Sequence, residues 1–436
     1  MSVGKSVGMV GILRTLLLDR NVRVIAVTGL VSGVYVGMLN GVLQLFPGTL
    51  GFSVAALGIF QALGNRFSGV ASSVVQPFAG HYADVHGRRL VILIGSVTTI
   101  VSMLLFAGAA VTSNWVLVLA GFVLFGISTL GSHASQAVIA ESVGLDGAKM
   151  NVAYSAIFLL AVAPGAVTPY VAGVIADRWG YLAIFLIAAL LESVDLFLYL
   201  KELTETRRDS GPKGEMQERA FSFTEALRLP RGDVGYFGAL AMDAFAFGIS
   251  SSIIYAIVED RFGFSPADIG LMVAVVSLSV IASQYHATRL LIKIGARKTL
   301  ILSESLGVVL MGGWVLADSL PIFLLLSVVF GVSISTWVPG VQSMLMSHSA
   351  PDERGAAGGK LAAFRGLVAF PAPIVGGVVY QGLGYQAPMV ASFVGAIVTV
   401  LLMLKYLPKP GEDVATPAPS SSAQRPVPIS MDDSGL

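Results

Sequence analysis

Long apolar runs alternate with short polar breaks along almost the whole chain. Each run is about 20 residues long, which is the length that a helix needs to cross the hydrocarbon core of a bilayer. Apolar windows predict twelve transmembrane helices in this sequence, and the fold class is therefore all-α membrane protein. The predicted spans are residues 22–46, 54–79, 90–111, 115–140, 153–176, 181–200, 236–258, 269–290, 299–317, 320–346, 361–379 and 388–407.

The composition agrees with membrane embedding. The chain has 436 residues, of which 55% are hydrophobic and only 12% are charged, whereas soluble domains carry about 25% charged residues. The absence of cysteine excludes disulfides, thiolate nucleophiles and thiolate metal sites. The five histidines are scattered, and the formal net charge of +1 does not indicate nucleic acid. We therefore expect no metal site and no nucleic-acid partner.

Lysine and arginine are distributed very unevenly between the predicted connections. If both termini are cytoplasmic, the opposite side holds only Arg178 and Arg261, while Arg66 and Arg365 lie within spans. Basic loops are retained in the cytoplasm. We therefore expect an integral protein of the cell (plasma or inner) membrane with both termini in the cytoplasm.

The connections also divide the chain into segments. We expect a cytoplasmic N-terminus at residues 1–21, a first six-helix bundle at 22–200 and a cytoplasmic linker at 201–235. A second six-helix bundle follows at residues 236–407. The tail, residues 408–436, is rich in Pro, Ser and Ala and is expected to be disordered.

The two halves repeat each other at nearly constant spacing. Residues 51–58 read GFSVAALG, and residues 263–270, 212 positions later, read GFSPADIG. Gly173 and Gly180 correspond to Gly377 and Gly384, both 204 positions later. Because glycine and proline punctuate backbone geometry, we interpret these matches as a structural repeat. Six spans in each half imply parallel repeats with a solute path between them.

A short charged motif follows the second span, where residues 80–89 read GHYADVHGRR. This motif resembles the signature loop between helices two and three of the major facilitator superfamily, in which Gly, Asp, Gly and paired basic residues have this spacing. The resemblance implies the major facilitator fold for residues from about 20 to about 407. In the helix-four position where many drug antiporters of the family carry arginine, this chain has Gly121.

The resemblance further implies a conformational latch at the cytoplasmic ends of the two halves. Gly80 is expected to allow close helix approach, and the partner would be residues 358–361 at the start of span eleven. A degenerate copy stands in the second half, with Ile292 in the acidic position. The expected latch residues are Gly80, Asp84, Gly87, Arg88, Arg89, Glu141, Gly295 and Arg297.

Ionisable side chains inside spans are functional candidates, since a charge at the bilayer centre costs about 2.5 to 3.5 kcal/mol on insertion scales. Arg66 lies near the middle of span two, beside a stripe at helical spacing made of Gln61, Asn65, Ser68, Ser72 and Gln76. Asp243 lies in span seven, which lines the central cavity in the family, and it could face Arg66 there. It is the preferred coupling carboxylate, although both residues could instead belong to buried structural ion pairs.

Further polar residues are weaker candidates. Glu192 and Asp195 stand one turn apart in span six and could carry a proton, although this span is usually peripheral in the family, which favours packing or snorkelling. Asn40 and Gln44 in span one, and His133 and Gln136 in span four, could line the cavity or mediate helix packing.

On this resemblance the chain is expected to be a secondary transporter that moves a small solute by alternating access. Proton coupling and export of an amphipathic compound are favoured, and uptake of a sugar or organic anion is the alternative. A channel, or a non-transporting receptor or scaffold, could use the same fold. No enzyme motif is present, so neither catalysis nor a cofactor is expected. The expected partners are the solute, protons and the lipid bilayer, and we expect a monomer.

Overall fold

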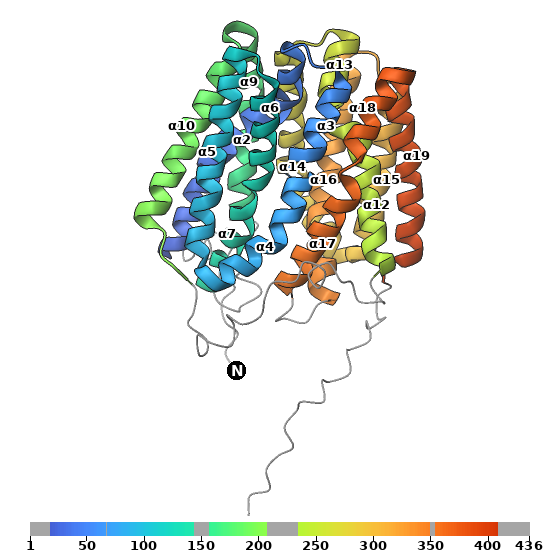
Figure 1. Cartoon of the computed structure of the whole chain (residues 1–436). Helices are drawn as coiled ribbons and strands as arrows, with labels where there is room; N and C mark the ends of the chain where they lie inside the picture. Colours follow the sequence, from blue (N-terminus) through green and yellow to red (C-terminus); the bar gives the residue numbers. More distant parts are fainter. Residues whose placement is uncertain (1–17, 67, 144–156, 207–233, 349–353, 409–436) are drawn as a thin grey trace, which may run out of the picture.

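The computed structural model describes residues 18–66, 68–143, 157–206, 234–348 and 354–408. Nearly all of them are helical, and the helices run side by side in one bundle (Figure 1). Among these residues, eleven helical segments are long and apolar enough to cross a membrane, and the second predicted span forms a further crossing from α3 and α4. The predicted all-helical membrane fold is confirmed.

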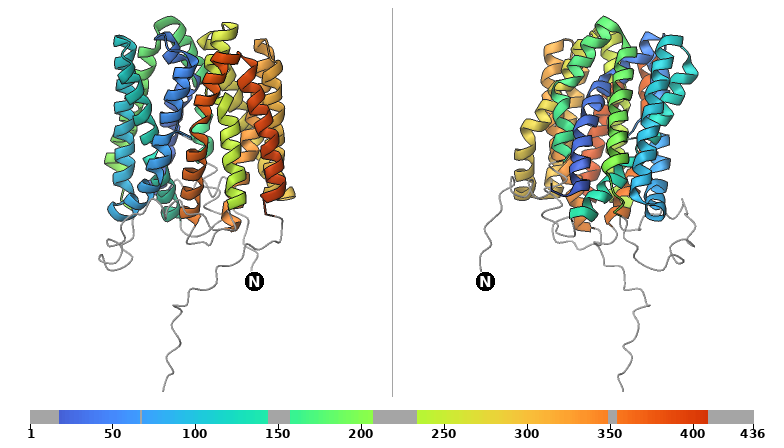
Figure 2. Two further views of the ribbon diagram at one scale, coloured as in Figure 1. Left: turned by 45° about the vertical axis from the view of Figure 1, so that its right-hand side comes forward. Right: turned by 90° about the vertical axis from the view of Figure 1, so that its left-hand side faces the viewer.

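The structure gives these bounds for the first half: α2 (Arg20–Thr49), α3 (Val54–Gly64), α4 (Val70–His86), α5 (Arg88–Thr112), α6 (Trp115–Ile127), α7 (Leu130–Val143), η1 (Ala163–Ala166), α9 (Thr168–Trp179) and α10 (Tyr181–Glu202). The second half comprises α12 (Val234–Ser251), α13 (Ile254–Phe262), α14 (Pro266–Ile294), α15 (Ala296–Leu316), α16 (Leu320–His348), α17 (Arg354–Ala369), α18 (Ala372–Leu383) and α19 (Gln386–Tyr406). The two halves stand next to each other (Figure 2). Helix α2 begins, and α19 ends, at the lower end of Figure 1, which we call the proximal end; the opposite end is the distal end.

The glycines that reveal the repeat stand at matching turns. Gly51 has a φ of 84° and Gly263 a φ of 69°, and each precedes a serine that caps the next helix. The hydroxyl of Ser53 accepts a hydrogen bond from the backbone N–H of Ala56 at 3.3 Å, and Ser265 accepts one from Asp268 at 3.1 Å. Left-handed backbone is costly for residues that carry a Cβ. The GFS motif is therefore a turn glycine followed by an N-cap.

Span two is broken, which the sequence did not predict. The predicted stripe of polar residues at helical spacing is interrupted, because α3 ends at Gly64 and α4 begins at Val70. Asn65 provides the hydrogen bonds that stabilise this break. Its carbonyl accepts hydrogen bonds from the N–H of Gly69 and the hydroxyl of Ser72, both at 2.9 Å. Its side-chain amide donates to Gln61 at 3.0 Å, and its side-chain oxygen accepts from the N–H of Ser68 at 3.2 Å. The polar groups of Gln61, Asn65, Ser68 and Ser72 therefore bond to one another at the break and do not form one continuous polar face of a helix.

Among the described residues, the two halves share a hydrophobic core at the distal end only. A continuous cluster of buried side chains there includes Phe46 and Leu57 from the first half and Ile257 and Phe323 from the second. At the proximal end, each half has a separate cluster of its own. The state described is therefore closed distally.

Glycine contacts seal the distal junction along two symmetric seams. A Cβ added to Gly58 of α3 would overlap the carbonyl oxygen of Pro373 on α18. A Cβ added to Gly270 of α14 would overlap the carbonyl oxygen of Pro169 on α9. The two glycines are repeat mates, as are the two prolines. Backbone therefore meets backbone at both seams.

Replacing Gly58 with alanine is expected to open the distal end, because the added methyl group cannot fit against Pro373. An overpacking cost of about 1 to 3 kcal/mol corresponds to a population shift of about 5- to 150-fold. On the other seam, Ala267 of α14 packs against Gly173 of α9. The chain contains no cysteine, so a single cysteine introduced at Ala267 reports the opening by its reaction with a membrane-impermeant maleimide.

The matched control for this substitution is Gly382→Ala on α18, where nothing lies within 4 Å of an added Cβ. Labelling should rise in the Gly58 variant and remain unchanged in the control. Equal labelling of both would show that the seam does not hold the distal end closed.

Candidate functional site

In the second half, an arginine and an aspartate from neighbouring helices form an ion pair. The guanidinium of Arg365 on α17 lies 2.8 Å from the carboxylate of Asp243 on α12. It also donates to the carbonyl of Leu240 at 2.9 Å and covers the ring of Trp337 at 4.4 Å from the centroid. The suggestion that Asp243 faces Arg66 is wrong, because Arg365 reaches it from a directly packed helix of the same half.

The sequence reasoning missed a third member of this cluster, Glu304 of α15. The residue is only 6% exposed, and its side chain lies beside the carboxylate of Asp243 and the indole of Trp337. Glu304 and Asp243 line one small cavity of about 10 Å³, which is room for about one water molecule. Glu304 could have been predicted as a candidate from the sequence, because it is a single acid inside the apolar run 299–317, just as Asp243 is a single acid inside span seven.

The first half holds a second cluster of the same composition. Arg66, in the break of span two, lies over the ring of Phe125 at 5.0 Å from the centroid. Glu192 of α10 is buried, accepts a hydrogen bond from the hydroxyl of Ser96, and lies within electrostatic reach of Arg66. Asp195 follows one turn later and is also buried. Each half thus combines one arginine over an aromatic ring with two buried acids.

Gln44 of span one does not line an open cavity but bridges the two halves. Span seven is interrupted between α12 and α13, which leaves backbone groups without helical partners. The side-chain amide of Gln44 donates to the carbonyl of Ser251 at 3.1 Å and accepts from the N–H of Tyr255 at 3.0 Å. One side chain from the first half therefore satisfies both ends of a break in the second half.

The other polar candidates of spans one and four are scattered. Asn40 stands at a non-helical position within α2, next to Gly41 with a φ of 88°, and its side chain is exposed. Gln136 on α7 is exposed and takes part in a further contact. The side chain of His133 lies outside the described part of the structure.

The arginines of the expected latch contact groups of their own half in the described part of the chain. Arg88 pairs with Glu141 at 3.3 Å, and the carboxylate of Glu205 accepts the backbone N–H groups of Arg88 and Arg89 at the start of α5. Gly80 has open space around it, as do the glycines at 358 and 359, so the expected close approach at Gly80 is wrong in this state. The side chain of Asp84 lies outside the described residues.

Two repeat-related arginines close helix ends. The guanidinium of Arg89 donates to the carbonyl of Leu200 at 2.7 Å, near the end of α10. Arg297 follows Gly295, a turn glycine with a φ of 81° like Gly87 at 104°. It donates to the carbonyls of Leu404 at 2.6 Å and Leu407 at 3.1 Å, at the end of α19. Cations are favourable at helix C-termini, so both arginines fasten the last span of their half to its third span.

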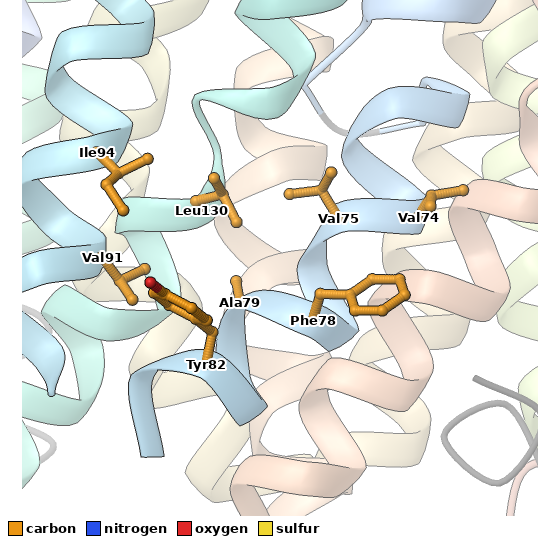
Figure 3. A pocket seen from close by; sticks show the side chains of 8 residues that line it. All are labelled: Val74, Val75, Phe78, Ala79, Tyr82, Val91, Ile94 and Leu130. Atoms are coloured by element: carbon orange, nitrogen blue, oxygen red, sulfur yellow. The ribbon is translucent and has the colours of Figure 1, made fainter. Parts of the chain in front are cut away.

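An apolar pocket of about 330 Å³ lies apart from both clusters (Figure 3). It is bounded by α4, α5 and the start of α7, and its lining is hydrocarbon except for the phenol of Tyr82. The lining residues are Val74, Val75, Phe78, Ala79, Tyr82, Val91, Ile94 and Leu130. Phe78, Tyr82 and Ile94 are exposed, as expected of a surface that faces lipid chains.

Two halves of membrane-spanning helices that join at the distal end, each with a buried charge cluster of its own, fit a membrane carrier of the secondary transport class. The chain belongs to the Major Facilitator Superfamily, whose family model matches residues 25–252 and 236–430. It is a transporter and not an enzyme.

Relatives of known name include drug-resistance proteins. The chain is 24% identical over 375 residues to the multidrug resistance protein MdtG of Enterobacter lignolyticus, covering 84% of this chain and 87% of the relative. It is 26% identical over 367 residues to multidrug resistance protein 1 of Bacillus subtilis, covering 81% and 86%. Among solved structures, a D-xylose-proton symporter has a TM-score of 0.65 at 16% identity, covering 91% of this chain and 98% of the symporter. The human organic anion transporter MFSD10 has a TM-score of 0.62 at 18% identity, covering 88% and 99%.

Replacing Gln44 with alanine is expected to weaken distal closure, because it leaves the carbonyl of Ser251 and the N–H of Tyr255 without partners. Unsatisfied buried groups cost about 1 to 3 kcal/mol each. The cysteine reporter at Ala267 should therefore become more reactive. Asn40→Ala, one helical turn away at an exposed position, serves as the control. A Gln44 variant with the parent's labelling rate would rule out this bridge as a determinant of closure.

Proposed function

We propose that this transporter is a proton-coupled exporter of amphipathic compounds. The observation that carries the proposal is the cluster in the second half, where Asp243 and Glu304 are both buried beside the single guanidinium of Arg365. A second, unbalanced negative charge would be costly there. The two carboxylates are therefore suited to hold one proton between them. Export is supported by the relatives named as multidrug resistance proteins.

The cluster is placed to respond to movement of the two halves. Gly366, the residue after Arg365, packs so closely on α4 of the first half that an added Cβ would overlap the hydroxyl of Ser73. On this proposal, rocking that separates α4 from α17 releases this contact and lets α17 shift against α12 of the same half, which moves Arg365 relative to Asp243. On this proposal, weakening the ion pair favours protonation of Asp243, and restoring it releases the proton.

Arg66 supplies a fixed positive charge in the first half. Arginine cannot practically be deprotonated, so it would act as a counter-ion or substrate ligand and not as a proton carrier. Its position over Phe125 combines a cation with an aromatic face, which suits a compound with both polar and apolar parts.

An uptake carrier for a sugar or an organic anion is the second candidate. The D-xylose symporter and the organic anion transporter share the fold at under 20% identity, and fold alone does not choose a substrate. A compound panel in proteoliposomes with an imposed pH gradient tests both candidates, because the direction of accumulation separates export from uptake. A receptor or scaffold would give no saturable, gradient-dependent flux.

The proposed orientation places the proximal end in the cytoplasm of a cell with the carrier in its plasma or inner membrane, working as a monomer. A fluorescent protein fused to either terminus is expected to fluoresce, and alkaline phosphatase fused there is expected to be inactive. The physical reason is the concentration of basic residues in the proximal connections. Active phosphatase at either terminus would contradict this orientation.

Replacing Asp243 with asparagine is expected to abolish accumulation driven by a pH gradient while leaving downhill exchange measurable, because the amide cannot carry the proton. Glu304→Gln should act in the same direction, whereas Arg66→Ala should also weaken binding. Asp318→Asn, an exposed carboxylate between α15 and α16, is the matched control. An Asp243 variant that still accumulates substrate with the parent's pH dependence would place the coupling site elsewhere.

A further inference from the structure

Asp195 of α10 is buried without a hydrogen-bond partner. The residue is 1% exposed, and neither carboxylate oxygen has a partner among the described residues. A buried carboxylate that accepts no hydrogen bond is costly if it is charged. Asp195 belongs to the first half and is not part of the proposed coupling site around Asp243, so that site does not explain why an acid is buried here. Its environment therefore indicates a missing ligand, and the smallest ligand that removes the cost is a proton.

The neighbours of Asp195 repeat the charge balance of the second half. Glu192 stands one turn away, and Arg66 is the one cation within its reach among the described residues. The other titratable groups that face the pair are Tyr35 of α2 and Tyr199 of α10. Helix α5 contributes the hydroxyl of Ser96, and α9, which also packs on α10, contributes no charged group among the described residues. Among the described residues, Arg66 thus reaches Glu192, and the charged neighbour of Asp195 is the carboxyl group of Glu192.

These groups form a line that leads toward the proximal end. Glu192, Asp195 and Tyr199 occupy positions i, i+3 and i+7 of α10 and therefore share one helix face. On the opposing helix α2, Tyr35 lies beside Glu192 and Thr28 lies beside Tyr199. Helix α10 ends three residues after Tyr199, at Glu202. Carboxyl and hydroxyl groups thus extend from the middle of the bundle to within one helical turn of the proximal end of α10.

We propose that Glu192 and Asp195 form a second proton-binding site, which exchanges its proton with the proximal side along the line that ends at Tyr199. This inference rests on the proposed proton coupling and extends it: the Asp243 site stays essential for accumulation, and the Asp195 site adds a second proton to the same cycle. The bound proton is shared by the two carboxyl groups and leaves one negative charge to balance Arg66. On release, the proton passes to water at the proximal face and no other bond changes.

A metal ion fits this site less well than a proton. The hard cations of proteins take about six oxygen ligands. The described residues contain no group of three or more His, Cys, Asp or Glu that could hold a metal. A proton needs only the two carboxyl groups that are present.

Infrared difference spectroscopy of the full chain in lipid tests the site without a transported compound. Spectra in mildly acidic and mildly alkaline buffer are compared in an Asp243→Asn, Glu304→Gln, Glu259→Gln background. This background removes the other proposed site and also Glu259, a partly buried acid that stands near Asp177 and Asp260 at the distal end. The carboxylic-acid C=O band is expected to diminish on alkalinisation. This change should be lost in Asp195→Asn and in Glu192→Gln, and kept in Asp318→Asn.

A band that persists unchanged in alkaline buffer, or a titration that is the same in Asp195→Asn, would overturn the inference. The conservative amides keep the side-chain shape, and the monodispersity of each variant checks that it has folded. A purely structural acid would not produce a titrating band that both substitutions remove.

A transport measurement separates this inference from the proposed function. With ethidium as the probe and the membrane potential clamped, the slope of the logarithm of accumulation against the pH gradient gives the protons exchanged per ethidium. The slope is expected to fall from about two to about one in Asp195→Asn. No gradient-driven accumulation by the parent chain would contradict the proposed drug export, and the infrared result would still decide the site. Accumulation with an unchanged slope would overturn the second site alone.

Discussion

A bilayer offers no hydrogen-bond partner to an interrupted helix, so each break in a span has to be satisfied by the protein itself. This constraint explains the two best-defined polar groups outside the charge clusters. Asn65 closes the break of span two with its own backbone and side chain. Gln44 closes the break of span seven from the other half. Because that second partner belongs to the opposite half, the local order of span seven is tied to the arrangement of the whole carrier.

Much of the fold was encoded strongly enough to predict. The hydrocarbon thickness fixes the length of an apolar run, and the turns at Gly51 and Gly263 use a positive φ that favours glycine, so both the spans and this repeat could be predicted. The break in span two was not visible. Its polar residues have the spacing of an amphipathic helix, and only the hydrogen bonds of Asn65 distinguish a closed break from a continuous helix.

The sequence predicted which types of residue form the candidate site, but it did not predict which residues form ion pairs with one another. Acids and arginines inside apolar runs are rare enough to be noticed one by one. Their partners are distant in sequence: Asp243 and Arg365 are 122 residues apart, and nothing in either span shows that α12 and α17 meet at this level. Glu304 is the one acid of the apolar run 299–317, and nothing in that run shows that it meets Asp243. The spacing of the charged loop also did not show that Arg89 bonds to the end of α10 within its own half.

The two distal seams consist of backbone atoms, with glycine facing the proline carbonyl on each side. At these two seams the closest contact itself involves no side chain larger than hydrogen on the glycine side. Substitutions that alter which compounds are accepted can therefore accumulate while the seal is retained, whereas the glycines of the seams admit no larger residue. A gate built in this way separates the evolution of substrate range from the preservation of the transport cycle.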